Sequence, residues 1–179
     1  QPHFLFNALN SLLALIHKNP AEAENLLLNL VDLFRSSLSH RTEFSLREEL
    51  DIMRRYLEIE QQRYGARMQV EWALHEPLPE RNVPALCLQP LAENAVKHGI
   101  QPDSRGGLIR ILAKPVANGV LVEIRNTLPE HGAADIEGFH IGLANTIERI
   151  RLSSEGRDRL RTEIEGGHFV ASLHLQLPR

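Results

Sequence analysis

The chain has 179 residues, of which 42% are hydrophobic and 24% are charged, and its formal net charge at pH 7 is -3. This length holds one medium domain, or a helical segment joined to a compact α/β domain. The sequence contains no basic stripe, which argues against nucleic acid as the main partner. The single cysteine, Cys87, excludes a disulfide within the chain. No apolar stretch approaches the roughly 20 residues that span a bilayer.

The first 65 residues are predicted to be helical. Asn19, Pro20 and Glu22 form a helix-start signal, and Ser45 with Glu48 forms a capping box before a further helix. The apolar residues recur at helical spacing: Leu5, Leu9, Leu12, Ile16, Leu27, Leu30, Val31, Phe34, Leu38, Leu46, Leu50, Met53, Leu57 and Tyr64. Two or three helices alone form only a thin core. We therefore expect the apolar stripes of these helices, their seams, to be buried against a second copy in a homodimeric four-helix-type bundle. Packing on the chain's own C-terminal part is the alternative.

After Gly65 the pattern changes to mixed α/β. Strands are predicted at residues 68–74, 108–113, 120–125, 160–165 and 169–177, and a helix is predicted at about 141–153. Asn118-Gly119 and Gly166-Gly167 are predicted to form hairpin turns. The fold class is therefore α+β: a helical region, residues 1–65, followed by an α/β sandwich, residues 66–179, with helices on one face of a mainly antiparallel sheet.

Residues 91–99, LAENAVKHG, place an acid, an amide and a base in an apolar run. On a helix, Glu93, Asn94, Lys97 and His98 fall on one side. The opposite stripe is apolar and consists of Leu88, Leu91, Ala92, Ala95 and Val96. An Asn oxygen suits Mg²⁺ that carries phosphates, and a lysine one turn on suits the phosphates themselves. The alternative is an amphipathic helix whose polar face is merely solvated.

Three segments in order resemble the motifs of LytS/YehU-type sensor histidine kinases. PHFLFN at residues 2–7 resembles the phosphoacceptor segment, ENAVKHG at 93–99 resembles the N-box, and GFHIGLAN at 138–145 resembles the last glycine box. The segments 84–91 and 56–64 also resemble that family, so the resemblance covers nearly the whole chain. It implies a dimerisation and phosphoacceptor region followed by an ATP-binding domain of the Bergerat (GHKL) type.

The resemblance also implies roles for individual residues. His3 would be phosphorylated from Mg-ATP, and the phosphoryl group would pass to an Asp of a response regulator. Asn7, one turn later, would orient a water for dephosphorylation. Glu93 and Asn94 would hold Mg²⁺, and Glu93 and Lys97 would act with His3 in catalysis. The implied nucleotide-binding residues are Asn94, Lys97, His98, Asn126, Gly138, His140, Gly142, Leu143 and Asn145.

The sequence departs from the family pattern at three positions. Asn126 stands where an Asp normally binds the adenine amino group, Leu128 replaces the glycine two residues later, and His140 replaces the middle glycine of the last glycine box. The segment 126–129 resembles the AlgZ/FimS branch. As a neutral acceptor, Asn126 binds more weakly than Asp. The alternative function is therefore a degenerate kinase, a dimeric module that signals by conformation without ATP turnover.

Other interpretations are less favoured. An ATPase or protein-serine kinase on the same fold would not need the His3 segment. The nine histidines show no paired-ligand spacing typical of a zinc enzyme. Because the chain opens at Gln1, inside a motif, we expect it to be the cytoplasmic portion of a protein anchored in the inner membrane through an upstream region.

Overall fold

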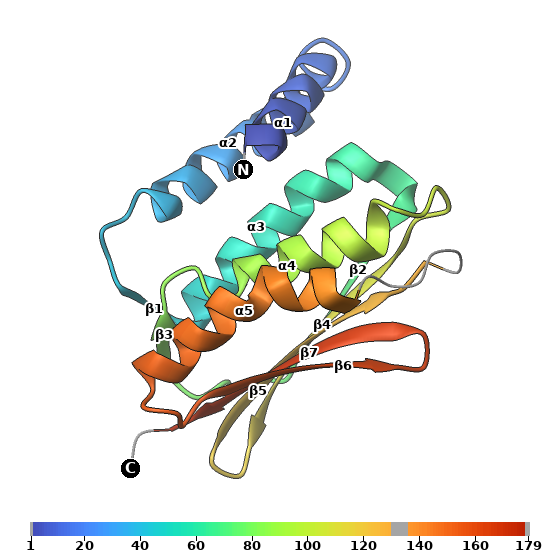
Figure 1. The fold of residues 1–179 in the computed structure, drawn as a ribbon. Coiled ribbons are helices and arrows are strands. Elements are labelled where there is room, and N and C mark those ends of the chain that lie inside the picture. Colours follow the sequence, from blue (N-terminus) through green and yellow to red (C-terminus); the bar gives the residue numbers. More distant parts are fainter. Residues whose placement is uncertain (1, 130–135, 178–179) are drawn as a thin grey trace.

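The computed structural model describes residues 2–129 and 136–177, with the backbone alone described for residues 2, 3 and 136–142. The elements in order are α1 (Pro2–Leu15), α2 (Pro20–Ser37), β1 (Glu43–Ser45), α3 (Leu46–Tyr64), η1 (Gly65–Arg67), β2 (Met68–Leu74), β3 (Asn82–Pro84), α4 (Gln89–Ala95), η2 (Val96–Ile100), β4 (Gly107–Val116), β5 (Gly119–Thr127), α5 (Ile136–Ser153), β6 (Arg159–Glu165) and β7 (His168–Gln176). Figure 1 shows a helical hairpin, α1–α2, above the layer formed by α3, α4 and α5, which covers one face of a sheet.

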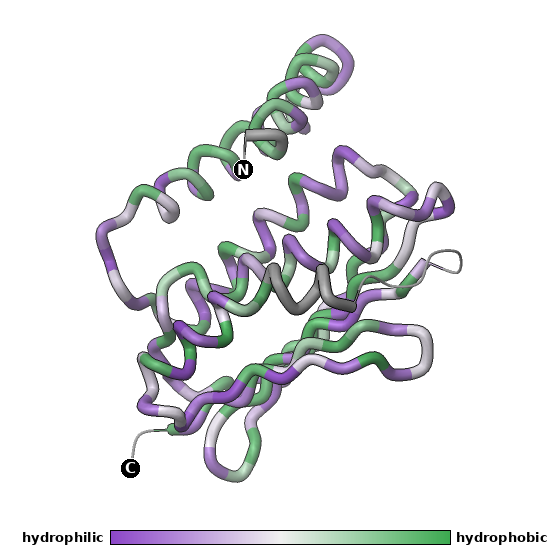
Figure 2. The backbone as a smooth tube through the Cα atoms, viewed as in Figure 1, coloured by the Kyte–Doolittle hydropathy of each residue, from purple (hydrophilic) through white to green (hydrophobic). Residues whose placement is uncertain are grey.

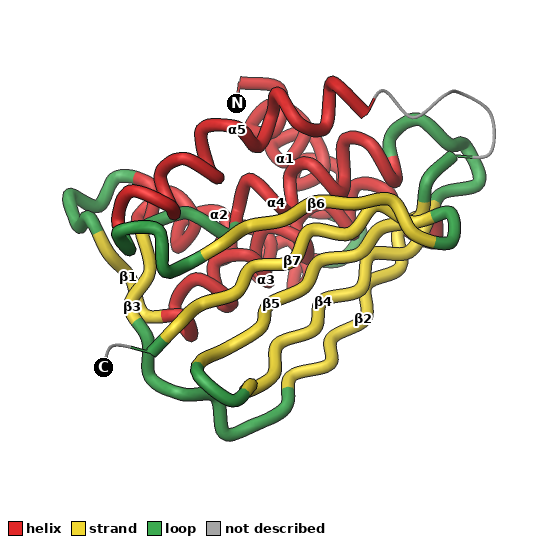
Figure 3. Tube along the Cα trace, turned by 60° about the horizontal axis from the view of Figure 1, so that its bottom comes forward, coloured by secondary structure: helices red, strands yellow, loops and turns green. Residues whose placement is uncertain are grey.

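The sheet has five strands in the order β2-β4-β5-β7-β6 (Figure 3). β2 pairs with β4 in parallel, and the other three pairs are antiparallel. The two predicted hairpin turns are present: Val116 pairs with Gly119, and Glu165 pairs with His168. Side chains alternate along β4 and β5, so one face of each strand is buried under the helices. The predicted α+β class is thus confirmed.

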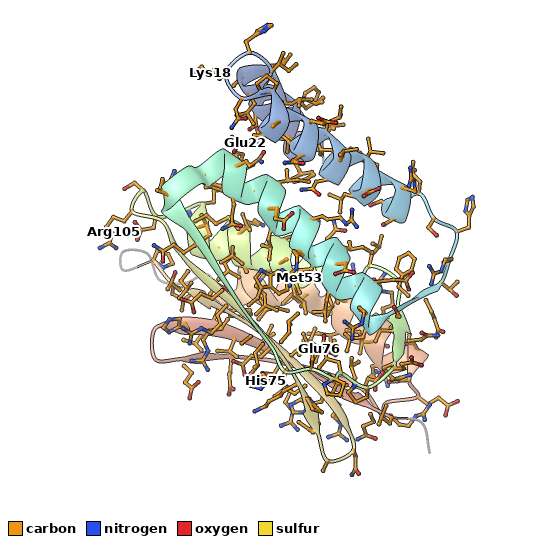
Figure 4. The ribbon with its side chains drawn as sticks, turned by 180° about the vertical axis from the view of Figure 1, so that it is seen from behind. Lys18, Glu22, Met53, His75, Glu76 and Arg105 are labelled. Carbon is orange, nitrogen blue, oxygen red and sulfur yellow. The ribbon has the colours of Figure 1, made fainter. Side chains whose placement is uncertain are left out.

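Helix α3 lies on the sheet layer, although its seam was predicted to pack on a second copy. The Ser45–Glu48 capping box starts the helix as expected. Leu50, Met53 and Leu57 are buried within the chain itself, and Met53 lies on the inner face of α3 (Figure 4). The seam prediction was therefore wrong for α3, because α4 and β2 supply the apolar surface that the seam needs.

The helical hairpin keeps an exposed apolar surface. Asn19 caps α2, and its side chain accepts a hydrogen bond from the Glu22 backbone N–H, as predicted. Ala8, Leu26, Leu30 and Leu33 are buried. Figure 2 shows how hydrophobic much of the hairpin is. Many of its other apolar residues remain exposed: Phe6, Leu9, Leu13, Ile16, Leu27, Leu28, Val31, Phe34 and Leu38. Within the described residues, we find no helix whose length and apolar character would suffice to cross a membrane.

Candidate functional site

The segment predicted as one regular helix, around Glu93 to His98, changes its winding part-way. α4 ends at Ala95 and continues as the π-helical turn η2, in which the Gln101 N–H bonds the Val96 carbonyl at 3.0 Å. The predicted apolar stripe is buried: Leu88, Leu91, Ala92, Ala95 and Val96. The wider turn directs the side chains after Ala95 differently from a regular α-helix, and Lys97 is exposed while His98 is half-buried. Such turns occur frequently at functional sites.

Two asparagines from different motifs are buried with an amide atom that has no hydrogen-bond partner. Asn94 on α4 is 6% exposed, and its Nδ2 is one of these atoms. Asn126 at the end of β5 is 0% exposed; its Nδ2 donates to the Thr127 carbonyl at 2.9 Å, but its Oδ1 accepts nothing. An unsatisfied buried polar group costs about 1–3 kcal/mol, so such groups commonly mark a functional site. The Asn126 Oδ1 suits an amino group as its donor.

Gly99 brings the end of the N-box segment against Asn126. A Cβ on Gly99 would lie 2.5 Å from the Asn126 Nδ2 and 2.9 Å from the Thr127 carbonyl oxygen. Only a glycine permits this approach. The structure therefore places the predicted adenine position and the N-box side by side, although more than 25 residues separate them in sequence.

The acidic residue of the N-box lies near α3. Glu93 is half-buried, and its Oε1 accepts a hydrogen bond from the Gln89 Nε2 at 2.9 Å. On α3, Glu60 is buried and pairs with Arg63 at 2.8 Å. Burial raises the pKa of the Glu60 carboxyl, Arg63 opposes the rise, and the charge of Glu93 adds to it.

The start of α1 packs on this same part of α3. His3 lies in α1, but its side chain is outside the described part of the chain. The ring of the next residue, Phe4, lies 5.2 Å from the ring of Tyr56, one turn before Glu60. Asn7 follows on α1 and is half-buried. Sequence reasoning missed that Tyr56 and Glu60 are buried, because α3 contacts α1 and α4, which are distant from it in sequence.

The glycine-box segment lies in a helix rather than in a loop. α5 begins at Ile136, earlier than the predicted start near Ile141, so Gly138, His140 and Gly142 are helical; their surroundings lie outside the described residues. A helical glycine costs only about 1 kcal/mol, which the rest of a long helix can offset. Farther along α5, Leu143 is buried and Asn145 is exposed, so only the former contributes to the core.

The described residues hold no group of three or more His, Cys, Asp or Glu side chains that could bind a metal ion. Mg²⁺ usually takes one or two protein ligands and completes its shell with water and phosphate oxygens. Asn94, with Glu93 beside it, provides ligands of that sparse kind. A polar groove of about 850 Å³ between α2 and α3 is lined by other residues, including Asn29, Arg55 and Glu58.

Comparisons with known proteins identify the family of this chain. The sequence model of the family described as "Histidine kinase" matches residues 1–68. Sensor protein LytS of Enterococcus faecalis is 33% identical over 192 residues, which cover 99% of this chain and 32% of LytS. Sensor histidine kinase BtsS of Escherichia coli is 37% identical over 126 residues, covering 70% of this chain and 22% of BtsS.

This chain belongs to the LytS/YehU-type sensor histidine kinases. It spans about a third of LytS and less than a quarter of BtsS. Among solved structures, histidine kinase ThkA in complex with the response regulator protein TrrA matches with a TM-score of 0.54 and 16% identity, over 90% of this chain and 51% of ThkA. That likeness shows the histidine-kinase fold, which agrees with the α+β core described above.

Proposed function

We propose that the chain is the core of a two-component sensor kinase, in which the α/β unit binds Mg-ATP and phosphorylates His3. The observation that carries the proposal is the close approach of the N-box segment, at Gly99, to Asn126, whose buried Oδ1 accepts no hydrogen bond. Asn126 would accept the adenine amino group, and Asn94 with Glu93 would hold Mg²⁺. When bound, Mg-ATP supplies the phosphoryl group and neutralises charge as it transfers.

The remaining residues act by position and charge. Lys97 is exposed beside this site and would contact phosphate, with His98 lining the pocket. The glycine-box residues Gly138, His140, Gly142, Leu143 and Asn145 would flank the phosphates. His3 would form the new P–N bond as the bond from the γ-phosphorus to the bridging oxygen breaks and ADP leaves. The phosphoryl group then passes to an Asp of a response regulator, and Asn7 would orient a water for its removal.

The division of labour along the chain is also part of the proposal. Residues 1–65 would supply dimerisation and the phosphoacceptor, and residues 66–179 would supply catalysis. Helix α3 falls within residues 1–65, but it packs in the core of the α/β unit. The chain would work as the cytoplasmic portion of a protein held at the inner membrane by an upstream region.

Calorimetry with Mg-ATP tests the first step. We expect the unaltered chain to bind in a metal-dependent manner and Asn94→Ala to lose the metal-dependent part. The exposed residue Glu24, on α2 away from this site, provides the control variant Glu24→Ala, which should bind normally. Absence of binding at millimolar ATP by folded protein would contradict the kinase proposal.

A second candidate function, a dimeric module that signals without turnover, is favoured by the neutral Asn126 at the adenine position. Incubation with γ-labelled ATP distinguishes the two. A kinase incorporates label that is lost in His3→Gln, whereas a conformational module binds nucleotide and incorporates none.

A further inference from the structure

A buried carboxylate on α3 holds the loop that leads into the N-box. Glu49 is 0% exposed. Its Oε1 accepts the backbone N–H of Leu86 at 2.5 Å, and its Oε2 accepts that of Leu88 at 2.9 Å. Cys87, between these two residues, is also fully buried. Leu86, Cys87 and Leu88 are consecutive, so a single side chain fixes the whole loop.

This contact matters because α4 has little support of its own. The helix has seven residues, and its N-cap, Leu88, makes no side-chain capping hydrogen bond. Short helices are unstable alone, and the first N–H groups of a helix need outside acceptors. Glu49 supplies such an acceptor from another element, and thereby sets where α4 begins.

The loop is also held from its other side. Arg149 on α5 donates from its Nη2 to the Leu86 carbonyl at 2.8 Å. Leu86 has a φ of +57°, a left-handed conformation that a branched side chain rarely adopts without outside support. The loop 86–88 is therefore fixed between α3 and the helix that contains the glycine box. A shift of either helix would move the start of α4.

We propose that Glu49 is a positioning residue for the nucleotide site: through loop 86–88 it fixes α4, and thereby the position of the Asn94 amide that would hold Mg²⁺. The proposal rests on the nucleotide-binding function proposed above. Glu49 is itself fully buried, so it would act on the site through loop 86–88. It holds α4, whereas the proposed adenine acceptor, Asn126, lies on β5.

The test compares Glu49→Gln with Glu48→Gln. The first substitution keeps the shape but presents an amide N–H₂ to backbone N–H groups in place of one oxygen. The second removes a neighbouring carboxylate of the same helix, whose bonds go to Ser45 and Arg41 rather than to α4. Two quantities are measured: amide hydrogen exchange across residues 86–100 without nucleotide, and the affinity for ATP with Mg²⁺ and with EDTA.

We expect Glu49→Gln to raise exchange at residues 86–100 at least tenfold and to weaken Mg-ATP binding at least tenfold, with little change in EDTA. Glu48→Gln should change neither quantity locally. Arg149→Ala releases the same loop from an exposed position, and should act in the same direction if Glu49→Gln fails to fold.

Unchanged exchange at residues 86–100 would overturn the proposal, as would exchange raised evenly across the sheet or an equal loss of affinity with and without Mg²⁺. An unaltered chain that binds no ATP would instead overturn the proposed function, and the exchange measurement would then decide alone whether Glu49 positions the helix.

Discussion

At the scale of single residues, the site contains polar groups that are buried without a hydrogen-bond partner. The Oδ1 of Asn126 and the Nδ2 of Asn94 have lost water and gained no protein partner. Each therefore destabilises the free protein by about 1–3 kcal/mol. An amino group bound at the Asn126 Oδ1 would recover this cost, whereas Mg²⁺ would bind the oxygen of the Asn94 amide and leave its Nδ2 unpaired. Stability and binding are therefore opposed at Asn126.

Gly99→Ala tests how closely the N-box must approach Asn126. The added methyl group would lie 2.5 Å from the Asn126 Nδ2 and force the β5 end or the π turn to move. We expect a loss of about 1–3 kcal/mol in the free energy of unfolding, together with weaker ATP binding. Urea denaturation and calorimetry measure the two effects.

Gly166→Asn is a matched control, because Gly166 lies in the β6–β7 turn with open space around it. Its φ of +56° is one that Asn tolerates in a hairpin turn. Its stability should stay within about 0.5 kcal/mol of the unaltered chain. If the Gly99→Ala variant is as stable as this control, Gly99 and Asn126 do not approach closely enough to exclude a methyl group.

At the scale of elements, α3 links the parts of the molecule. Its inner face packs in the core, Glu49 holds the loop before α4, and Tyr56 meets Phe4 of α1. Its N-terminus is fixed by the capping box, in which the Glu48 carboxylate accepts the Ser45 backbone N–H at 2.7 Å and also pairs with Arg41. These contacts lower the pKa of Glu48 to about 2.

This lowered pKa gives a dependence of stability on pH. A carboxylate whose pKa falls on folding stabilises the protein above its unfolded pKa of 4.5, and that contribution is lost as the pH falls toward about 2. Glu48→Gln removes it. Since Glu48 is half-exposed, we expect a difference of about 1 kcal/mol or less at pH 7.

Urea denaturation at several pH values checks the sign. The difference in free energy of unfolding between the unaltered chain and Glu48→Gln should shrink as the pH falls from 4.5 to about 2. A difference that stays constant over that range would show that the ionised form of Glu48 is not what stabilises the helix start.

Local signals identified most elements, and tertiary packing decided what they could not. Asn19 at a helix start, the Ser45–Glu48 box and the Gly166-Gly167 turn act within a few residues, so the sequence alone predicted them. The π turn after Ala95 follows no local rule, and it accompanies the close approach of Gly99 to Asn126. The burial of Glu49 and Glu60 could likewise not be predicted from the sequence, because it depends on segments that are distant along the chain.

At the scale of the whole molecule, the helical hairpin α1–α2 and the α/β unit differ in how much of their apolar surface is buried. The α/β unit buries most of its large apolar residues, whereas the hairpin α1–α2 exposes many of its own. Burying one such side chain contributes about 1.5–3 kcal/mol. The hairpin is thus the surface where a second copy would gain most, which agrees with the proposed homodimer.

The double variant Leu13→Glu, Leu28→Glu tests that surface. Both side chains are more than half exposed, at 66% and 55%, so folding should be little affected. We expect sedimentation velocity to show a monomer at concentrations where the unaltered chain is a dimer, with Mg-ATP binding retained.

Leu152→Glu is the control, since Leu152 is as exposed, at 63%, but lies on α5. It should leave the dimer intact. If the double variant still sediments as a dimer, association does not run through the hairpin.

The protein contains one tryptophan, Trp72, in β2, and the guanidinium of Arg54 from α3 lies 4.3 Å from the centre of its ring. Stacking of a cation on the indole face couples the ring's surroundings to the position of α3. Helix α3 also holds the loop before α4. The intrinsic fluorescence of the unmodified chain therefore reports on the position of α3. Titrating nucleotide and following this emission would reveal, without any label, whether filling the site displaces α3.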